Sequence, residues 1–437
     1  MSFKWPMTRL RYLAEFNPPV PSSIRRSSDR LLPLFSMETI SDFGLPLAPE
    51  LRETSSLLTG YAFITQDDVA YAKVTPCFEN GKGIVGTELD GPAFATTELT
   101  VLRPKPLMNQ RFLSYILRSD LFRGPAIASM TGAGGLRRVS ETDMKDLPIP
   151  TPGLALQNRI SDYLDHETAE IDAFILDQNR LRLLLEEKAV ATIQRGVTGS
   201  AHNDATNTVP WLPGLPTPYK VVNIRRVADM RTGHTPNRST PDYWSGERVI
   251  PWFTLADVWQ LRQNRKYMNE TEECITIEGL ANSAAELLPA GTVVLSRTAS
   301  VGFTGVMPSP MATSQDFWNW VPHKELIPEY LWYQFRAMRP EFDRLKSGST
   351  HKTIYQADAA GMRILLPSLE EQQRIVEHLD HADSVSRDAS ADITRAINLA
   401  KERRAALITA AVTGQIDVTH KQRPAVEQLQ DDLEEQA

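Results

Sequence analysis

An internal repeat constrains the fold of this chain more than any other feature of its sequence. Residues 152–199 and 367–414 align without a gap, at a constant offset of 215 residues. The matching positions are Pro152, Leu154, Gln157, Arg159, Ile160, Leu164, Asp165 and His166 in the first copy and Pro367, Leu369, Gln372, Arg374, Ile375, Leu379, Asp380 and His381 in the second. A repeat that keeps one register over this length indicates a duplicated structure, so we expect the order globular unit, helix, globular unit, helix.

Each copy of the repeat is predicted to form one long helix. A proline can only precede such a helix, and Pro152 and Pro367 stand at the start of the two copies. A glycine suits the C-terminal cap, and Gly199 and Gly414 stand at their ends with no proline between. At 1.5 Å per residue, about 40 residues make a rod on the order of 60 Å long.

Apolar residues recur along both predicted helices with the spacing of a coiled coil. They are large in the first helix, at Ile160, Leu164, Ile171, Phe174, Leu181 and Leu185, and smaller in the second, at Ile375, Leu379, Ala382, Ala389, Ile393, Ala396, Ala400 and Leu407. Large residues facing small ones favour two antiparallel helices in close contact. The interface is predicted to contain Ile160, Leu164, Ile171, Leu181, Ile375, Leu379 and Ile393. Two independent helices, each packed only on its own domain, remain the alternative.

The sequence around the repeat divides the rest of the chain. Two segments alternate β-branched or aromatic residues with turn signals and are then followed by a short helix, which predicts mixed α+β units with several short strands. A polar and then proline-rich stretch is typical of a linker, and an acidic stretch poor in apolar residues is typical of a tail. The predicted segments are a first globular unit 1–150, a first helix 151–199, a linker 200–218, a second globular unit 219–364, a second helix 365–416 and an acidic tail 417–437.

The composition excludes several classes of protein. The chain has 437 residues, 41% hydrophobic and 23% charged, which is ordinary globular usage. No apolar run approaches the roughly 18 residues of a spanning helix, and the first residues lack the apolar stretch of a signal peptide. Cys77 and Cys274 have no second Cys or His at ligand spacing, so we expect neither a disulfide framework nor a zinc site. The sequence predicts a cytoplasmic protein.

The net charge of −7 argues at first sight against binding to nucleic acid. The acidic excess, however, falls mainly in the two predicted helices and the tail, and both globular units are nearly neutral. Such units are suited to reading DNA grooves by geometry, and less suited to coating DNA by bulk charge.

Two short motifs resemble catalytic sites, but each lacks an essential part. Asn17-Pro-Pro-Val is similar to the loop of adenine methyltransferases that holds a flipped base, yet Val20 cannot stack on that base and no glycine-rich cofactor loop is present. Pro241-Asp242 with Glu247-Arg248 is similar to a nuclease metal site, but the lysine is missing and the spacing is short. We therefore expect no catalytic centre in the chain.

The repeated His–Asp pairs raise the question of a metal site. His166 and His381 follow Asp165 and Asp380 at equivalent positions of the two helices. Four groups from two rods would have to converge on one ion, so solvated helix faces or contacts with a partner are the favoured interpretation, and no metal is expected.

Several blocks in a fixed order resemble the DNA-specificity subunits of type I restriction-modification systems, over nearly the whole chain. In the second half they are Thr232-Gly-His-Thr-Pro-Asn, Tyr243-Trp-Ser-Gly, Ile250-Pro-Trp-Phe, Leu288-Pro-Ala-Gly-Thr-Val-Val-Leu-Ser-Arg, Ser347-Gly-Ser-Thr and Ile364-Leu-Leu-Pro-Ser-Leu-Glu-Glu-Gln-Gln-Arg-Ile-Val. In the first half they are Lys73-Val-Thr-Pro-Cys-Phe-Glu-Asn-Gly-Lys and Thr97-Glu-Leu-Thr-Val-Leu-Arg-Pro. The first half lacks the Thr-Gly-x-Thr-Pro block, so contact residues do not carry over between the halves.

The resemblance implies a fold and a function. The fold is α+β, with two globular target-recognition domains joined by two long antiparallel coiled-coil helices in a pseudo-twofold duplicated arrangement. Each domain is expected to read one half of a split sequence in double-stranded DNA. The helices are expected to dock two methyltransferase subunits, which bind S-adenosylmethionine, and restriction subunits that combine motor and nuclease can join. The chain itself needs no cofactor. A fused methyltransferase and a helical scaffold that does not bind DNA remain the alternatives.

Candidate DNA contacts are basic, hydroxyl or amide residues in glycine-bearing loops. There the backbone can approach phosphates and side chains can reach base edges. The candidates are Lys73, Asn80, Lys82, Arg137 and Arg138 in the first half and Arg231, Thr235, Asn237, Arg238, Arg297, Ser300, His351 and Lys352 in the second.

Overall fold

The computed structural model describes most of both globular units and of both helices. The described residues are 5–27, 29–43, 46–133, 135–199, 211–212, 219–245, 247, 249–345 and 353–418. Most of the predicted linker 200–218, nearly all of the acidic tail 417–437, and the candidates His351 and Lys352 lie outside them.

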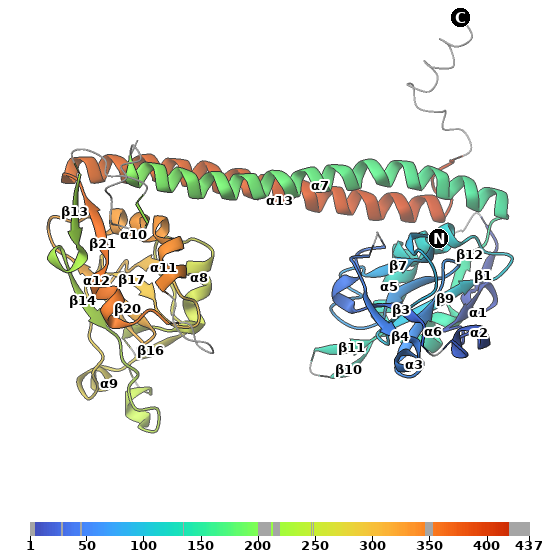
Figure 1. Ribbon diagram of the computed structural model, residues 1–437, viewed down its shortest axis with the longest axis horizontal. Coiled ribbons are helices and arrows are strands. Elements are labelled where there is room, and N and C mark those ends of the chain that lie inside the picture. Colours follow the sequence, from blue (N-terminus) through green and yellow to red (C-terminus); the bar gives the residue numbers. More distant parts are fainter. Residues whose placement is uncertain are drawn as a thin grey trace, which may run out of the picture. The chain divides into compact units, whose positions relative to one another are not determined.

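The chain divides into two structural units, each described here by itself (Figure 1). Unit 1 comprises residues 1–178 and 394–437, and unit 2 comprises residues 179–393. Two long helices, α7 (Leu154–Thr198) and α13 (Leu369–Val412), contribute residues to both units. Their bounds confirm the two helices predicted from the repeat.

Unit 1 contains two four-stranded sheets, with strand orders β2-β9-β6-β7 and β4-β3-β8-β5, and two small ribbons, β1-β12 and β10-β11. All pairs are antiparallel except β3-β8. The strands are β1 Met7–Arg9, β2 Ala14–Phe16, β3 Leu31–Phe35, β4 Glu50–Glu53, β5 Tyr61–Ile64, β6 Val69–Ala72, β7 Gly83–Val85, β8 Ala93–Thr96, β9 Leu99–Pro104, β10 Thr131–Ala133, β11 Leu136–Arg138 and β12 Pro148–Pro150. The helices are α1 Leu10–Leu13, α2 Ser22–Arg25, α3 Thr54–Leu57, α4 Gln110–Arg118, α5 Asp120–Ala128 and α6 Glu141–Asp146, with 3-10 turns η1 Met37–Thr39 and η2 Gly86–Glu88.

Strand β6 shows why this part of the sequence forms a buried strand. All four of its residues are buried. Val69 and Tyr71 belong to the core that includes α4 and α5, whereas Ala70 and Ala72 belong to the core between the two sheets. Side chains of a strand alternate between its faces, so larger residues pack against helices and small ones let the second sheet approach.

Unit 2 repeats the main features of this plan. Its main sheet has the order β14-β20-β17-β18, its second sheet β16-β15-β19, and its ribbon β13-β21. The strands are β13 Lys220–Asn223, β14 Ala228–Thr232, β15 Ile250–Phe253, β16 Glu273–Ile275, β17 Val293–Ser296, β18 Thr304–Val306, β19 Ala312–Thr313, β20 Phe317–Pro322 and β21 Arg363–Leu366. The helices are α8 Trp259–Arg262, α9 Ile277–Ala281, α10 Pro328–Ala337, α11 Arg339–Leu345 and α12 Gln356–Gly361, with 3-10 turns η3 Ile224–Arg226, η4 Pro241–Tyr243 and η5 Leu255–Val258. The predicted α+β duplication is confirmed.

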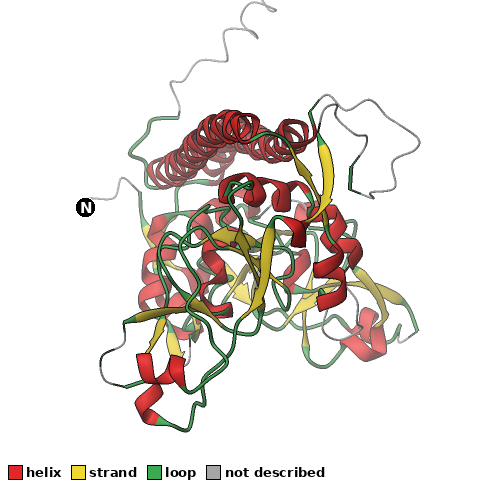
Figure 2. Ribbon diagram, turned by 90° about the vertical axis from the view of Figure 1, so that its left-hand side faces the viewer, coloured by secondary structure: helices red, strands yellow, loops and turns green. Residues whose placement is uncertain are grey.

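The long helices pack antiparallel within each unit. In unit 1, Ile160 and Leu164 share a core with Ile408 and Val412 near the other end of α13. In unit 2 the shared core is formed by Ile193 and Val197 of α7 with Ile375, Val376 and Leu379 of α13. Residue numbers therefore rise along one helix as they fall along the other, as predicted. Figure 2, with unit 2 facing the viewer, shows the two helices side by side and nearly end-on.

Six of the seven predicted interface positions are buried, whereas Leu181 is exposed. Ile160, Leu164, Ile171, Ile375, Leu379 and Ile393 are buried, with at most 9% of the side chain exposed. Leu181 is 43% exposed, and Phe174 is 44% exposed. The less exposed positions of α7 in this region include Gln178, Arg182 and Leu185. Two of these are polar, so the apolar period of the sequence points to the wrong side of the helix here.

A buried glutamine at the start of each helix explains one repeated position. The side chain of Gln157 donates to the carbonyls of Leu107 and Pro152 and accepts from the amide of Asn109. Gln372 makes the same three bonds with Glu325, Pro367 and Ile327. Both glutamines are fully buried, so each one satisfies backbone groups of the loop that its helix covers.

The repeated aspartates attach the helices to the globular units. The Tyr115 hydroxyl donates to Asp165 at 2.6 Å, and the Tyr333 hydroxyl donates to Asp380 at 2.5 Å. Burial, followed by the hydrogen bond to the carboxylate, raises the pKa of both tyrosines, so each stays a donor. The aspartates thus act as anchors for tyrosines of α4 and α10.

Candidate nucleic-acid interface

In unit 1 all five candidates lie in two connected segments, the loop that follows β6 and the hairpin β10-β11. Val74 forms a β-bridge with Arg138, and the Val139 amide donates to the carbonyl of Lys73 at 2.8 Å. The Thr75 hydroxyl donates to the Gly135 carbonyl at 2.7 Å, which ties the hairpin to the loop. This hairpin therefore presents Arg137 and Arg138 beside Lys73 and Asn80.

The hairpin arginines are exposed and held by carboxylates. Arg137 donates to Glu79 at 3.1 Å, and Arg138 forms a two-pronged pair with Glu98 at 2.7 and 3.2 Å. The hydrogen bond from Arg138 lowers the pKa of Glu98, so this carboxyl is charged. The side chains of Arg137 and Arg138 are nearly half exposed, so their guanidinium groups remain accessible to a phosphate or a base edge.

Lys82 differs from the other candidates of unit 1. Its ammonium group donates to the backbone carbonyl of Met37 at 2.5 Å and is partly buried. Asn80 is exposed in the turn between β6 and β7. The ammonium group of Lys82 therefore stabilises this loop, and the same group is less available for a contact with DNA.

Arg297 of unit 2 occupies the position that Lys73 occupies in unit 1. Each residue directly follows the equivalent strand, β6 or β17. The backbone amide of Lys73 donates to the backbone carbonyl of Glu98 at 2.8 Å, and that of Arg297 to the backbone carbonyl of Asp316 at 2.9 Å. These two acidic residues directly precede the neighbouring strands of the sheets, β9 and β20. The Arg297 carbonyl accepts from Ile354, as that of Lys73 accepts from Val139. The duplicated scaffold thus places a cation at the same point in both units.

The environment of the Arg297 side chain differs from that of a surface lysine. The guanidinium carbon lies 4.4 Å from the centre of the Trp318 ring, and the buried Nε atom has no hydrogen-bond partner among the residues that the structure describes. Sequence analysis did not identify Glu98, Asp316 or Trp318 as parts of these sites, because their partners are distant in sequence. The sequence does offer one signal for Glu98 and Asp316, because each is an acidic residue that directly precedes a strand.

Arg238 is a less open candidate than its loop suggests. Both of its terminal nitrogens donate to Glu273 at 2.6 Å, and its guanidinium carbon lies 3.9 Å from the centre of the Trp244 ring. Its neighbour Asn237 accepts from the backbone and side chain of Ser239 and so caps the turn. The two donors of Arg238 that face Glu273 can reach a base or phosphate only by exchanging this carboxylate.

The remaining candidates of unit 2 fall into two groups. Arg231, in β14 just before the Thr-Gly-His-Thr-Pro loop, is exposed beside Asp229 and Glu286. The hydroxyl of Thr235, within that loop, donates to Gln315 at 2.6 Å. Ser300 is only 5% exposed and accepts from Arg262 at 2.6 Å. Ser300 therefore supports the Arg262 side chain, and its direct contact with DNA stays a prediction.

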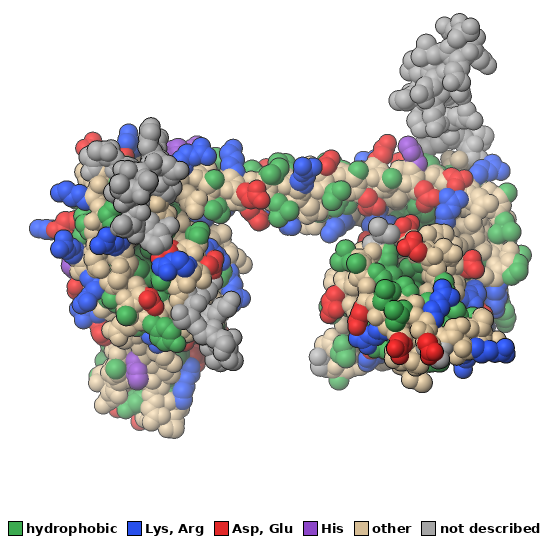
Figure 3. All heavy atoms as spheres, in the orientation of Figure 1, with side chains coloured by type: hydrophobic (Ala, Val, Ile, Leu, Met, Phe, Trp, Pro, Cys, Tyr) green, Lys and Arg blue, Asp and Glu red, His purple; other side chains and the backbone are tan. Residues whose placement is uncertain are grey.

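The surface of each unit mixes both signs of charge. Figure 3 shows Lys and Arg side chains interspersed with Asp and Glu on the visible face of both units. Such a surface agrees with selective contacts in a few loops more than with broad electrostatic coating.

Asn17 of the methyltransferase-like block has a structural role. Its side chain accepts from the Val101 amide at 3.0 Å and donates to Glu141 at 2.8 Å, and its φ is +49°. The amide group that would hold a flipped base therefore braces a turn.

Within the described residues, no three His, Cys, Asp or Glu side chains converge as metal ligands would. None of the helices in the same part of the chain has the length and apolar character needed to cross a lipid bilayer.

Comparison with known proteins decides the family. The profile of the type I restriction modification DNA specificity domain matches residues 79–178 and 216–398, which together are more than half of the chain. The chain belongs to the type I restriction-modification specificity family. The first matched segment lies within unit 1 and the second covers most of unit 2, so the family domain matches both units.

Relatives within the specificity family agree with this assignment. The MjaIX specificity subunit of Methanocaldococcus jannaschii is 28% identical over 173 residues, 39% of this chain and 39% of that protein. The EcoAI specificity subunit of Escherichia coli is 33% identical over 158 residues, 36% of this chain and 26% of that protein. These alignments thus span less than two thirds of either relative.

A solved structure supports the fold over nearly the whole length. A chain from a study of complex assembly and conformational transition in a type I R-M system superposes with a TM-score of 0.70 at 20% identity, covering 95% of this chain and all of that one. The arrangement of strands and helices is therefore shared with that chain.

Proposed function

We propose that this chain is the non-catalytic DNA-reading subunit of a type I restriction-modification complex. Each unit reads one half of a bipartite site in double-stranded DNA. The observation that carries the proposal is the duplicated scaffold, which places Lys73 and Arg297 at the same point of two sheets whose surrounding loops differ. One scaffold with two different loop sets is what the reading of two different half-sites requires.

The loops of unit 1 supply Lys73, Asn80, Arg137 and Arg138 to this interface. Exposed arginines that already pair with a carboxylate can exchange it for a guanine edge or a phosphate, since both accept the same forked donors. In unit 2 the matching set is Arg231, Thr235, Asn237, Arg238 and Arg297, with Lys352 and His351 outside the described residues.

The long helices provide docking surfaces for two methyltransferase subunits, one on the helix pair of each unit. In unit 1 the exposed apolar side chains of the pair include Leu176 and Leu399, 69% and 68% exposed. In unit 2 they include Leu183, Val190 and Val385, 55 to 57% exposed. Large apolar residues gathered on one exposed element are typical of a surface that a partner covers.

The partners bring the chemistry that this chain does not supply. Methyl transfer takes place in the docked methyltransferase subunits, which bind S-adenosylmethionine, and restriction subunits can add DNA translocation and cleavage. The complex acts on chromosomal and invading DNA in the cytoplasm.

Sequencing of methylated bases tests the proposal. The chain, co-expressed with its partner methyltransferase in a host without other modification, should produce methylation at one bipartite motif with a fixed gap. The matched control is the methyltransferase alone, which should leave this motif unmodified. Methylation of DNA by the purified chain without a partner would contradict the proposal, as would a complex that shows no sequence preference.

A further inference from the structure

Unit 2 contains a hollow that the proposed DNA reading does not use. It has a volume of about 450 Å³ and lies between the helix pair and the elements α8, β18, α10 and α11. Its lining includes four arginines, Arg182, Arg336, Arg339 and Arg387, and an apolar part that includes Trp332, Phe303 and Ile193. We call it the arginine cavity. Its size is within the range of sites for small molecules.

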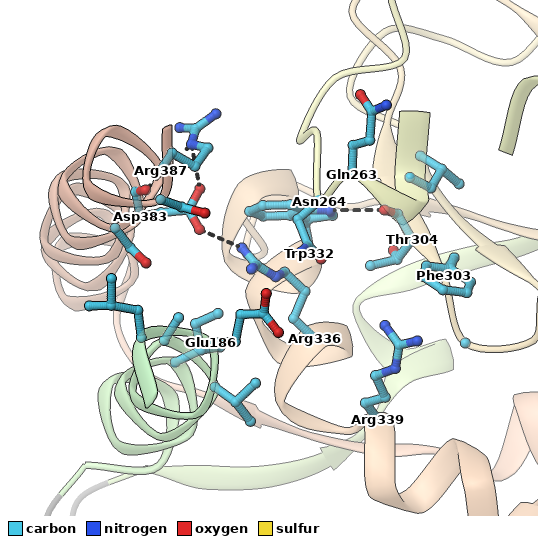
Figure 4. A pocket seen from close by; sticks show the side chains of 18 of the residues that line it. Glu186, Gln263, Asn264, Phe303, Thr304, Trp332, Arg336, Arg339, Asp383 and Arg387 are labelled. Atoms are coloured by element: carbon cyan, nitrogen blue, oxygen red, sulfur yellow. Dashed lines mark hydrogen bonds and ion pairs between the residues drawn. The ribbon is translucent and has the colours of Figure 1, made fainter. Parts of the chain in front are cut away.

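Two of the four arginines are committed to one carboxylate. Arg336 and Arg387 both donate to Asp383, at 3.2 Å in each ion pair, and Figure 4 shows Arg336 reaching from α10 toward Asp383 on α13. The Asp383 and Arg336 side chains are only 12% exposed. This group of two arginines and one aspartate therefore forms one wall of the cavity and keeps one positive charge in excess.

The other two arginines have no carboxylate partner among the described residues. The Nε atom of Arg182 is buried and makes no hydrogen bond. The guanidinium carbon of Arg339 lies 4.2 Å from the centre of the Phe303 ring. Glu186, which is exposed, is the other acidic side chain of the lining. Four guanidinium groups therefore face two carboxylates, which leaves the cavity positively charged.

The duplication supplies an internal comparison for this cavity. The helix repeat pairs Ala189 of unit 2 with Arg404 of unit 1, and Arg387 with Asp172. In unit 1, Arg404 is 13% exposed and bridges Asp42 at 2.7 Å and Asp172 at 3.2 Å, joining α13 to both the globular unit and α7. In unit 2, Ala189 stands at the position of the bridging Arg404, and Arg387 stands at the position of Asp172.

We propose that the arginine cavity binds a small organic phosphate. Arg182 and Arg339 supply the uncommitted forked donors that phosphate prefers, and Trp332, Phe303 and Ile193 supply apolar surface for the rest of the molecule. In unit 1 a cation, Arg404, bridges two carboxylates, those of Asp42 and Asp172. In unit 2 an anion, the bound phosphate, bridges two arginines in its place. The ligand thus connects α7 of unit 2 to α11.

Calorimetric titration of the full chain, without DNA and in phosphate-free buffer, tests this proposal with phenyl phosphate and inorganic phosphate as probes. Phenyl phosphate should bind saturably with one site per chain and more tightly than inorganic phosphate. Arg339→Ala and Arg182→Ala should each weaken its binding at least tenfold. Arg374→Ala removes an exposed arginine of the same unit and should leave binding unchanged.

A second variant separates the cavity from surface charge. Ala189→Phe keeps all four arginines but fills the hollow, so it should abolish phenyl phosphate binding, while a thermal melt shows that the variant is folded. Absence of binding at millimolar probe overturns the proposal. Equal weakening by Arg374→Ala and Arg339→Ala, or full binding by a folded Ala189→Phe, overturns it as well. Because no DNA or methyltransferase is present, none of these results bears on DNA reading.

Discussion

At the scale of single residues, the structure places several arginines in different surroundings. Arg138, Arg238 and Arg297 look alike in the sequence, as arginines in loops. The structure gives them different environments: an exposed carboxylate pair for Arg138, a carboxylate pair stacked on Trp244 for Arg238, and a partly buried stack on Trp318 for Arg297. These environments predict different consequences of substitution.

Arg238 is expected to stabilise unit 2 in addition to any contact with DNA. Arg238→Ala removes an exposed ion pair and a cation–π contact, which together cost about 1 kcal/mol of unfolding free energy. Arg238→Lys should recover only part of this, because lysine cannot donate to both oxygens of Glu273 and stack at the same time. Urea denaturation of the three proteins measures the difference. Equal midpoints for all three would mean that the stack contributes nothing.

Asp172 predicts a pH dependence of stability in unit 1. Burial, with the nearby charge of Asp42, raises the pKa of Asp172 to about 6, although Arg404 lies 3.2 Å away. The folded state then binds a proton that the unfolded state has released between about pH 4 and 6. The contribution of this group to stability is therefore largest below about pH 4 and is lost as the pH rises through about 6. Asp172→Asn should remove this decline in denaturation curves at about pH 5 and 7, and an unchanged pH profile would contradict it.

At the scale of elements, the buried glutamine at the start of each long helix is the strongest local link. Gln157→Met keeps the shape but leaves an amide and two carbonyls without partners. We expect a loss of about 2–4 kcal/mol of unfolding free energy from these buried groups. The next residue, the exposed Asn158, offers a matched control: Asn158→Ala should change the midpoint of unfolding far less. Equal losses from the two variants would mean that the buried bonds of Gln157 contribute little.

The corrected seam predicts opposite results for two neighbouring apolar residues of α7. Ile171 is 9% exposed, so Ile171→Asp buries a charge without a partner and should cost several kcal/mol, whereas Ile171→Val and Ile171→Leu should be tolerated. Leu181→Asp should leave the thermal melt of the free chain almost unchanged, because this side chain is 43% exposed. The same variant should weaken pull-down of the methyltransferase if that face docks it. A large loss of stability from Leu181→Asp would mean that Leu181 packs in the interface of the two helices, as the sequence predicts.

The elements also show what sequence reasoning can and cannot reach. The repeat predicted both helices and their antiparallel packing, since periodic apolar residues and capping signals are local. It failed at Leu181, because Gln178 and Arg182 are less exposed there and only the partner surface decides which side of the helix faces inward. Candidate loops were found from glycines and cations. Their carboxylate partners, such as Glu98 for Arg138, are distant in sequence and could be found only in the fold.

At the scale of the whole molecule, two units that each read one half-site predict independent specificities. Exchanging residues 219–364 for the same segment of a relative should change one half of the methylated motif and leave the other half and the gap intact. A change of both halves at once would rule out the two-reader model.

Single substitutions at the equivalent positions sharpen this test. Lys73→Ala should affect the half-site read by unit 1 and Arg297→Ala only the other. A contact with a base edge is worth about 1–3 kcal/mol of discrimination, whereas a contact with a phosphate weakens all sequences alike and lowers the salt slope. Binding of each partner-bound variant to both half-site libraries, at two salt concentrations, distinguishes these cases.

The division of the chain into units has a consequence for the order of synthesis. All of unit 2 lies within residues 179–393, so every residue of its core has left the ribosome before unit 1 is complete. Unit 1 needs Ile408, Ala411 and Val412 to cover Ile160 and Leu164. In a nascent chain these two side chains therefore stay uncovered by α13 until residues 408–412 have been synthesised and have emerged from the ribosome.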